Sequence, residues 1–347
     1  MIKIKSAGLL EIKFEADSEV LWLEVLLLGD NDVRSLTIDE AIEAVEAAFK
    51  EKELGRAQMP PKTYLFYKKY EGDLRVMPSY LEELDISGVK VVNVHPNNPR
   101  KYNLPSVMAI VVLVDPKNGN PISIMNGAYL TAMRTGAASG IATKYLARRE
   151  SKILALIGAG VQARTQLMAI AEVLDLEEVR VCDKSAEAQK KFIEKSREMY
   201  PFKFVGCKSE NCVVGADVIS TTTPSTTPIL KNDWIEPGMH INAIGADAPG
   251  KEELDPLILK RAKIVVDDWA QALHSGEVNV PLTKGIITEK DIFGELGEII
   301  AGKKPRRVTN DEITIFDSTG LSIQDVTIAT KIFKKAKARK LGKWIIL

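Results

Sequence analysis

Three cations stand inside strand-like segments of the first hundred residues that are otherwise apolar or aromatic: Lys62, Arg75 and Lys90. A cation buried in such a segment is costly unless an anion pairs with it. One interpretation is therefore a pocket for a carboxylate, to which arginine offers a planar fork of donors and lysine a point charge. The other is that the side chains point to solvent from the polar face of a sheet. The residues alone leave both interpretations open.

An aspartate later in the chain, Asp247, has the chemistry of a general acid/base. It follows the strand-like residues 239–244 in the sequence Gly-Ala-Asp-Ala-Pro-Gly-Lys. If that strand belongs to a parallel sheet, its carboxyl end faces the ligand crevice. A carboxylate placed there can transfer a proton to or from a substrate. The alternative is that Asp247 caps the next helix.

A glycine-rich turn in the middle of the chain indicates a nucleotide. Residues 153–157 form an apolar strand, and residues 161–174 have helical periodicity. Between them, Gly158 permits a tight turn, and Gly160 lets the backbone approach a pyrophosphate, while Ala163 lets the helix pack closely on the strand. The helix N-terminus then offers free N–H donors to the phosphates.

The segment after this helix supports the same interpretation. Residues 178–182 form a second strand that ends at Asp183. The acid lies close to the spacing of about 20 residues expected of a carboxylate that binds the adenosine ribose. The order of strand, turn, helix, strand and acid predicts a dinucleotide-binding unit. The alternative is an unrelated glycine turn followed by an ordinary acid at the end of a strand.

The elements around these residues divide the chain in two. Residues 59–125 contain several strand-like segments without helices between them, which favours a largely antiparallel sheet. A long helix rich in alanine and glycine, residues 128–146, then leads to the glycine-rich turn. From there strands and helices alternate, which predicts a parallel, doubly wound sheet. The predicted fold class is therefore α/β, with an added α+β part.

Composition narrows the class of protein. The 347 residues carry 47 Lys or Arg and 47 Asp or Glu, a balance that argues against binding to nucleic acid or to a membrane surface. The three cysteines form neither a CxxC pair nor a disulfide pattern, and they suit a reducing cytoplasm. The three histidines are not paired at metal-ligand spacing, so no metal is expected. No apolar run is long enough to cross a bilayer, and we expect a cytoplasmic protein.

Seven separated motifs together resemble the ornithine cyclodeaminase/mu-crystallin family, from about Leu26 to the C-terminus, with the greatest similarity to its alanine dehydrogenase branch. The motifs are Met59-Pro-Pro-Lys62, Arg75-Val-Met-Pro78, Lys90-Val-Val-Asn-Val-His-Pro96, Met133-Arg134-Thr-Gly-Ala-Ala, Gly158-Ala-Gly160-Val-Gln162, Asn242-Ala-Ile-Gly-Ala-Asp247-Ala-Pro-Gly-Lys251 and Phe316-Asp317-Ser318-Thr319-Gly320.

This resemblance implies two domains and a homodimer. A Rossmann NAD-binding domain, residues 141–305, is inserted into a substrate-binding and dimerisation domain built from residues 26–140 and 306–347. Residues 1–25 lie outside the family pattern and are expected to form an N-terminal extension.

The resemblance also implies residue roles. Asp247 is the expected catalytic acid/base. Lys62 and Lys90 are expected to contact a substrate carboxylate, with Arg75 and Thr319 in the same substrate site. Arg134 is expected to reach the cofactor pyrophosphate. The remaining expected cofactor residues are Ser106, Gly158, Gly160, Val161, Gln162, Asp183, Thr223, Asn242, Ala243, Ile244, Lys251 and Ser318.

The implied activity is an NAD-dependent oxidation of a small amino acid, L-alanine, to its 2-oxo acid. Arg75 stands where we expect ornithine cyclodeaminases to place a glutamate that pairs with a side-chain ammonium. An arginine would repel that ammonium, so the substitution favours a small neutral substrate. Ornithine cyclodeaminase, ketimine reductase and a non-catalytic, mu-crystallin-like binding protein remain as alternatives, and the preference for NAD over NADP rests on Asp183.

Overall fold

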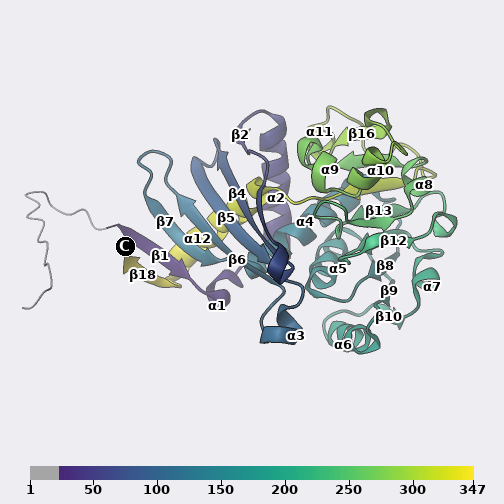
Figure 1. Ribbon diagram of the computed structural model, residues 1–347, viewed down its shortest axis with the longest axis horizontal. Helices are drawn as coiled ribbons and strands as arrows, with labels where there is room; N and C mark the ends of the chain where they lie inside the picture. The colour runs from purple at the N-terminus through teal and green to yellow at the C-terminus, as the bar shows by residue number, and fades with distance from the viewer. Residues whose placement is uncertain (1–22) are drawn as a thin grey trace, which may run out of the picture.

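The computed structural model describes residues 23–347. Two eight-stranded sheets lie side by side, each with its own helices (Figure 1). The predicted N-terminal extension, residues 1–25, falls outside the described residues except at its end, where Glu24 and Val25 already belong to the first strand. The α/β fold class predicted from the sequence is confirmed.

The first sheet is largely antiparallel, as the sequence predicted for residues 59–125. Its order is β18-β1-β7-β6-β5-β4-β2, with β3 paired to β4, and only the β1–β7 pair is parallel. The strands are β1 (Glu24–Leu28), β2 (Ala57–Gln58), β3 (Thr63–Tyr67), β4 (Gly72–Leu81), β5 (Ile86–Val94), β6 (Val107–Val114), β7 (Pro121–Asn126) and β18 (Lys343–Ile346).

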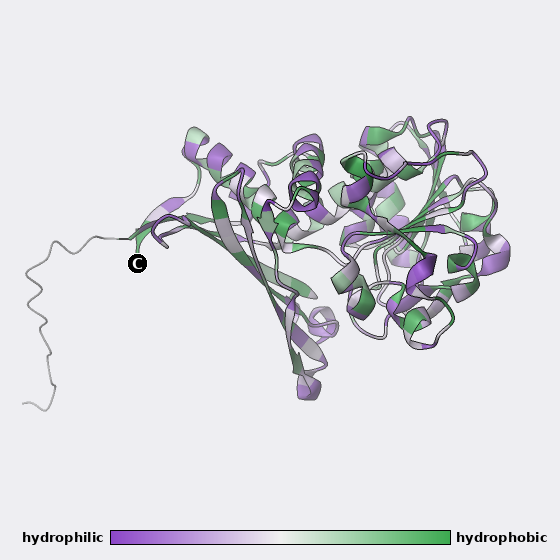
Figure 2. Cartoon of the chain, turned by 90° about the horizontal axis from the view of Figure 1, so that it is seen from above, coloured by the Kyte–Doolittle hydropathy of each residue, from purple (hydrophilic) through white to green (hydrophobic). Residues whose placement is uncertain are grey.

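One face of this sheet is covered by helices, which Figure 2 shows nearly edge-on. The long helix α12 packs on β4, β5 and β6, and α2 and α4 pack beside it. Burial alternates along β4 and β5, so that Arg75 and Lys90 point to the covered face. The helices of this part are α1 (Asp30–Val33), α2 (Ile38–Glu53), α3 (Asn98–Tyr102), α4 (Ala128–Leu146) and α12 (Ser322–Arg339), with a 3-10 turn η1 (Lys68–Tyr70).

The second sheet is parallel throughout and is doubly wound, as predicted. Its order is β10-β9-β8-β11-β13-β17-β15-β16. Its strands are β8 (Ile153–Ile157), β9 (Glu178–Cys182), β10 (Lys203–Gly206), β11 (Val218–Thr221), β13 (His240–Ala243), β15 (Lys263–Val266), β16 (Ile292–Glu295) and β17 (Thr314–Asp317), and a separate small sheet joins β12 (Thr226–Leu230) to β14 (Glu252–Leu254).

Short helices connect these strands. The glycine-rich turn leads directly into α5, which starts at Val161 and ends at Val173. The helices of this part are α5 (Val161–Val173), α6 (Ala186–Arg197), α7 (Ser209–Val213), α8 (Pro256–Leu259), α9 (Trp269–Ser275), α10 (Asn279–Thr283) and α11 (Leu296–Ile300), with 3-10 turns η2 (Asn232–Trp234) and η3 (Glu289–Asp291).

Helix α4 joins the two parts, and its small residues explain how. A Cβ atom added to Gly136 would lie 2.4 Å from the carbonyl oxygen of Thr165, and one added to Gly140 would lie 2.9 Å from that of Ala169. Both carbonyls belong to α5, so the two helices touch backbone to backbone. The small residues of α4 therefore permit close packing on α5.

Two features near the C-terminus differ from expectation. Strand β17 pairs with β13 and β15, so it belongs to the second sheet although it lies beyond residue 305, our predicted boundary. We propose that the chain returns to the first domain only after Asp317. Strand β18 was not predicted; it pairs antiparallel with β1, which is more than three hundred residues away in the sequence, so no local pattern signals it.

Candidate active site

Asp247 lies between two cations at the carboxyl edge of the second sheet. It follows β13, and its carboxylate accepts a hydrogen bond from Arg75 Nη1 at 2.9 Å and one from Lys251 Nζ at 2.5 Å. Arg75 comes from β4 of the first sheet, so this contact joins the two domains. About 36% of the Asp247 side chain is exposed, which leaves it accessible to a ligand.

The two cations control the ionisation of Asp247. Burial alone would raise its pKa, but the charges of Arg75 and Lys251 outweigh burial and hold the pKa of Asp247 well below its usual range. The carboxylate is therefore ionised at neutral pH. It is suited to accept a proton or to orient a water molecule, and less suited to deliver a proton that it already carries.

A second carboxylate, Asp73, holds Arg75 from the other side. Arg75 donates from Nε and Nη2 to the two oxygens of Asp73, at 2.9 and 3.1 Å. The ring of Tyr64 lies over the guanidinium, 5.4 Å from its carbon to the ring centroid. The arginine that we expected in the substrate site is thus already engaged by two acids, and its direct contact with substrate stays a prediction.

Lys62 connects the substrate side to the turn after β17. Its Nζ atom donates to the carbonyl oxygen of Thr319 at 2.5 Å. Burial lowers the pKa of Lys62 to about 8, against the opposing charge of Asp267. Asp267 in turn accepts hydrogen bonds from the backbone N–H groups of Thr319 and Gly320, both at 2.7 Å. The predicted substrate residues Lys62 and Thr319 are therefore in direct contact.

Lys90 is fully buried, although we expected it to contact a substrate carboxylate. Its side chain has no exposed surface, and Nζ lies 2.7 Å from the carboxylate of Asp325, near the start of α12. Arg134 approaches the same carboxylate at 3.2 Å. Burial, together with the Arg134 charge, lowers the pKa of Lys90 to about 7. A substrate could contact Lys90 only if this side chain became exposed, so that role stays a prediction.

Arg134 also donates to the side chain of Gln324 at 3.2 Å and lies against Gly320. Its side chain is about 10% exposed. Arg134 thus borders the turn that contains Ser318 and Thr319. Its contact with a pyrophosphate stays a prediction.

The glycine-rich turn has the geometry that a dinucleotide needs. Gly158 adopts φ of +108°, which favours glycine, and a Cβ at this position would lie 2.6 Å from Thr222 Oγ1. Gly160 is the N-cap residue of α5, and nothing lies within 4 Å of a Cβ placed there. Val161 is 69% exposed beside it. The turn therefore leaves open space in front of a helix N-terminus, which fits a pyrophosphate.

Asp183 is directed back at this turn. One carboxylate oxygen accepts from the backbone N–H of Ala159 and the other from that of Ser185, both at 2.8 Å. Gln162, the second residue of α5, accepts from Thr165 through its backbone carbonyl at 3.1 Å. The predicted adenosine-side residues therefore gather at one end of β8 and β9.

The residues expected near the nicotinamide lie on three adjacent strands. β11, β13 and β17 run parallel, so their carboxyl ends meet at one edge, where Thr223, Ile244 and Ser318 follow one another across the sheet. Ser106 comes from the first domain, between α3 and β6, where its carbonyl accepts from His95 at 2.8 Å. Within β13, the Asn242 side chain is buried and donates to Thr143 at 3.0 Å, so only its backbone is available toward a ligand.

Sequence reasoning missed the acids that hold this site together. Asp73, Asp267 and Asp325 pair with the predicted cations or support the predicted turns, as described above. Asp73 was visible as the second residue before Arg75, but Asp325 and Asp267 are far from their partners in the chain and carried no local signal.

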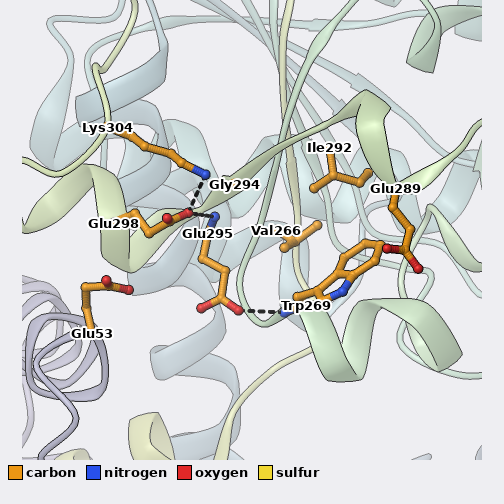
Figure 3. Close-up of a pocket in the computed structure, with 9 residues that line it drawn as sticks. All are labelled: Glu53, Val266, Trp269, Glu289, Ile292, Gly294, Glu295, Glu298 and Lys304. Carbon is orange, nitrogen blue, oxygen red and sulfur yellow. Dashed lines mark hydrogen bonds and ion pairs between the residues drawn. The ribbon is translucent and has the colours of Figure 1, made fainter.

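A surface pocket elsewhere does not carry this chemistry. It lies beside β16 and α9 and is lined by several acids (Figure 3). Glu298 pairs with Lys304 at 2.9 Å, and Glu295 accepts from the backbone of Trp269 at 2.9 Å. Its charges are thus largely satisfied internally. Among residues 23–347, no cluster of His, Cys, Asp and Glu could hold a metal ion, and no helix is long and apolar enough to cross a membrane.

The parallel second sheet with its glycine-rich turn, together with the first sheet, which supplies buried cations, defines a dinucleotide-dependent enzyme. The chain belongs to the ornithine cyclodeaminase/mu-crystallin family, whose sequence model matches residues 25–340. The resemblance found in the sequence is therefore confirmed.

Individual relatives differ in their reactions. The chain is 49% identical to alanine dehydrogenase of Archaeoglobus fulgidus, over 92% of this chain and 98% of that protein. It is 35% identical to a delta(1)-pyrroline-2-carboxylate reductase of Bacillus cereus, over 92% and 99%. Among solved structures, an archaeal alanine dehydrogenase dimer with bound NAD superposes with a TM-score of 0.89 at 48% identity, covering 93% of this chain and 99% of that one. The Thermococcus litoralis delta(1)-pyrroline-2-carboxylate reductase in complex with NADH and L-proline gives 0.90 at 42% identity, covering 92% and 99%.

Proposed function

We propose that this protein is an NAD-dependent dehydrogenase of a small neutral amino acid, L-alanine, which it converts reversibly to pyruvate and ammonium. The cofactor is NAD: the turn at Gly158 and Gly160 fits a dinucleotide, and close solved relatives carry NAD or NADH. The observation that carries the proposal is the contact of Asp247 with Arg75, which places an ionised carboxylate beside a cation at the carboxyl edge of the nucleotide-binding sheet.

NAD, held at the turn of Gly158 and Gly160, would supply the hydride acceptor for the amino-acid Cα, and loss of that hydride converts the amino acid to an imine. Asp247 then accepts a proton from the water that attacks the imine carbon, a role that suits a carboxylate kept ionised by two neighbouring cations. It passes this proton to the amino nitrogen, the C–N bond breaks, and the proton of the new hydroxyl leaves with the nitrogen, so that pyruvate and ammonium are released. Lys62 and Arg75 attract the substrate carboxylate toward the junction of the two domains. In the reverse direction, Asp247 returns the proton as water leaves.

The charges around Asp247 favour a neutral side chain. Arg75, Lys62 and Lys251 all lie on this side of the site, and a substrate with a second ammonium would be repelled by them. This argument supports alanine over ornithine.

A second candidate is the reduction of a cyclic imine, such as pyrroline-2-carboxylate. The solved relative with L-proline and NADH is 42% identical to this chain. That reaction uses the same hydride transfer at Cα and the same carboxylate contacts, but it needs no hydrolysis. The two candidates therefore differ in whether Asp247 must activate water.

The test is a substrate panel followed by NADH absorbance. Purified protein is assayed with NAD and individual L-amino acids, and with NADH and either pyruvate plus ammonium or pyrroline-2-carboxylate. Alanine dehydrogenase predicts the highest kcat/KM for L-alanine and for pyruvate with ammonium. A higher kcat/KM for the cyclic imine would replace our proposal with the second candidate, and release of proline from L-ornithine without net NADH would support ornithine cyclodeaminase.

We also propose that the protein is a homodimer, joined through the uncovered face of the first sheet. Cross-strand register places apolar residues in continuous rows on this face, one of which runs through Val76, Val91 and Ile110. Ile110 is 49% exposed, and in Figure 2 no helix lies on this side of the sheet. Such a patch favours a partner sheet. Light scattering should give a dimer at micromolar concentration, and Ile110→Lys should shift it toward the monomer; a wild-type monomer would contradict the proposal.

A further inference from the structure

Glu253 is a fully buried acid that the reaction described above does not use. It lies in the short strand β14, outside the main parallel sheet, and its residue is 0% exposed. A buried carboxylate is costly unless donors surround it. Its contacts therefore indicate why the fold keeps it.

Four donors surround this carboxylate, two on each oxygen. One oxygen accepts from the backbone N–H and the hydroxyl of Thr223, both at 2.7 Å. The other accepts from the hydroxyl of Thr221 at 2.7 Å and from the backbone N–H of Gly245 at 2.8 Å. Thr221 and Thr223 belong to the end of β11 and the loop after it, whereas Gly245 belongs to the loop after β13. A single side chain thus ties two loops of the active-site edge together.

The two loops also touch each other at this point. A Cβ atom added to Gly245 would lie 2.1 Å from the carbonyl oxygen of Thr223 and 2.5 Å from the Glu253 carboxylate. Only glycine fits this approach. Asp247 follows two residues later, so the position of the proposed proton acceptor depends on how this loop is held.

The strand that carries Glu253 is itself anchored. The backbone N–H groups of Glu253 and Leu254 donate to the carboxylate of Glu277, at 2.9 and 2.7 Å. The backbone N–H of Glu277 donates to Asp317 at 2.8 Å, at the end of β17. The carboxylate of Glu253 therefore presents its oxygens from a fixed backbone.

We propose that Glu253 is a positioning residue, which holds the loops after β11 and β13 in the arrangement that receives the nicotinamide half of NAD and aims Asp247 at the substrate. The inference rests on the proposed function only for the part played by Asp247. Its effect on the cofactor requires no particular amino acid. The adenosine half of NAD, by contrast, is served by β8, β9 and the glycine-rich turn, to which Glu253 makes no hydrogen bond.

The test is the isosteric variant Glu253→Gln. Two of the four donors are backbone N–H groups that cannot turn around, so an amide NH₂ placed on either oxygen site opposes at least one of them. Calorimetric titration with NADH and with ADP-ribose separates the two halves of the cofactor. We expect NADH affinity to fall by about tenfold or more, because a buried donor loses its acceptor. The affinity for ADP-ribose should stay within about twofold of the wild type, a small difference in binding free energy.

Glu252→Gln is the matched control. Glu252 is the neighbouring residue on the same strand and is also buried, but its carboxylate lies 3.4 Å from Lys284 and makes no hydrogen bond to either loop. It should bind both ligands like the wild type. Equal weakening of NADH and ADP-ribose by Glu253→Gln, or no weakening of either, would overturn the proposal.

Thr221→Val decides the question if Glu253→Gln fails to fold. It removes one donor and keeps the shape of the side chain, so NADH affinity should fall by less than in the glutamine variant while ADP-ribose affinity is unchanged. Unchanged NADH affinity in a folded Thr221→Val would then overturn the proposal. Because these titrations contain no amino acid, their outcome is independent of whether L-alanine is the substrate.

Discussion

Replacing Asp247 by asparagine tests the proposed chemistry most directly. Asparagine keeps the shape of the side chain but removes the site that accepts a proton. In the structure the two carboxylate oxygens receive one cation each, Lys251 on one and Arg75 on the other. An amide offers only one oxygen, so one of these cations faces an NH₂ group instead. We therefore expect turnover to be lost through the missing proton acceptor, with a smaller contribution from the displaced cation.

The size of the loss follows from the role. A group that moves a proton in the transition state contributes about 10²–10⁴-fold in rate, which corresponds to about 3 to 5 kcal/mol of activation free energy. NADH binding should be preserved, because the substitution removes a negative charge near an anionic cofactor and leaves the glycine-rich turn untouched. The measurements are steady-state kinetics with L-alanine and NAD, and NADH titration by fluorescence.

Asp73→Asn is the matched control. Asp73 is the other carboxylate that holds Arg75, but it has no contact with Lys251 and no proposed part in proton transfer. If Asp247→Asn lost turnover only because Arg75 lost one of its two acidic partners, Asp73→Asn would lose as much turnover. We expect the control to change KM more than kcat. Our reasoning would be refuted if Asp247→Asn kept more than about a tenth of the wild-type kcat, well inside the range of general acid/base effects, or if both variants lost kcat equally.

Three further outcomes are expected. Asp183 should make NAD the better cofactor, because its carboxylate repels a 2′-phosphate; kcat/KM with NADP should be lower in the wild type, and Asp183→Gly should narrow the difference. Lys90→Met should destabilise the protein by about 3–5 kcal/mol in urea unfolding, because Asp325 loses a fully buried partner, and Asp325→Asn in the same background should recover part of that loss. Burial lowers the pKa of His240 to about 3 from an ordinary value of 6.5, so the folded ring stays neutral while the unfolded chain takes up a proton. The stability that this provides is present above pH 6.5 and is lost as pH falls toward 3; NMR should show no titration of the His240 ring between pH 8 and 5, and a midpoint inside that range would contradict its burial.

Much of the fold was predictable because its signals are local. The apolar strand at residues 153–157, the two glycines after it and the helix that follows are encoded within about twenty neighbouring residues, and each has one steric or hydrogen-bonding reason. The helix at residues 128–146 was likewise evident from its small residues. The structure places both helices where they were predicted and shows that their backbones touch at Gly136 and Gly140.

The partners of the charged residues were not predictable in the same way. The sequence alone left open whether Lys62, Arg75 and Lys90 face solvent or line a pocket for a carboxylate. The tertiary structure pairs Arg75 with Asp73 and Asp247, and it buries Lys90 against an acid at the start of α12. Arg75 and Lys90 therefore have different surroundings although they lie in the same sheet.

The same division explains why the place of β17 and the contacts of Glu253 were not predicted. Only the packing of the complete fold decided that β17 enters the second sheet between β13 and β15. It was also docking that brought Glu253 to the loops after β11 and β13. The spacing of apolar residues and the positions of glycines involve residues that are close together in the chain, so the sequence alone determines them. Ion pairs, strand order and hydrogen bonds between loops join residues that are distant in the chain, and the packing of the complete fold decides them.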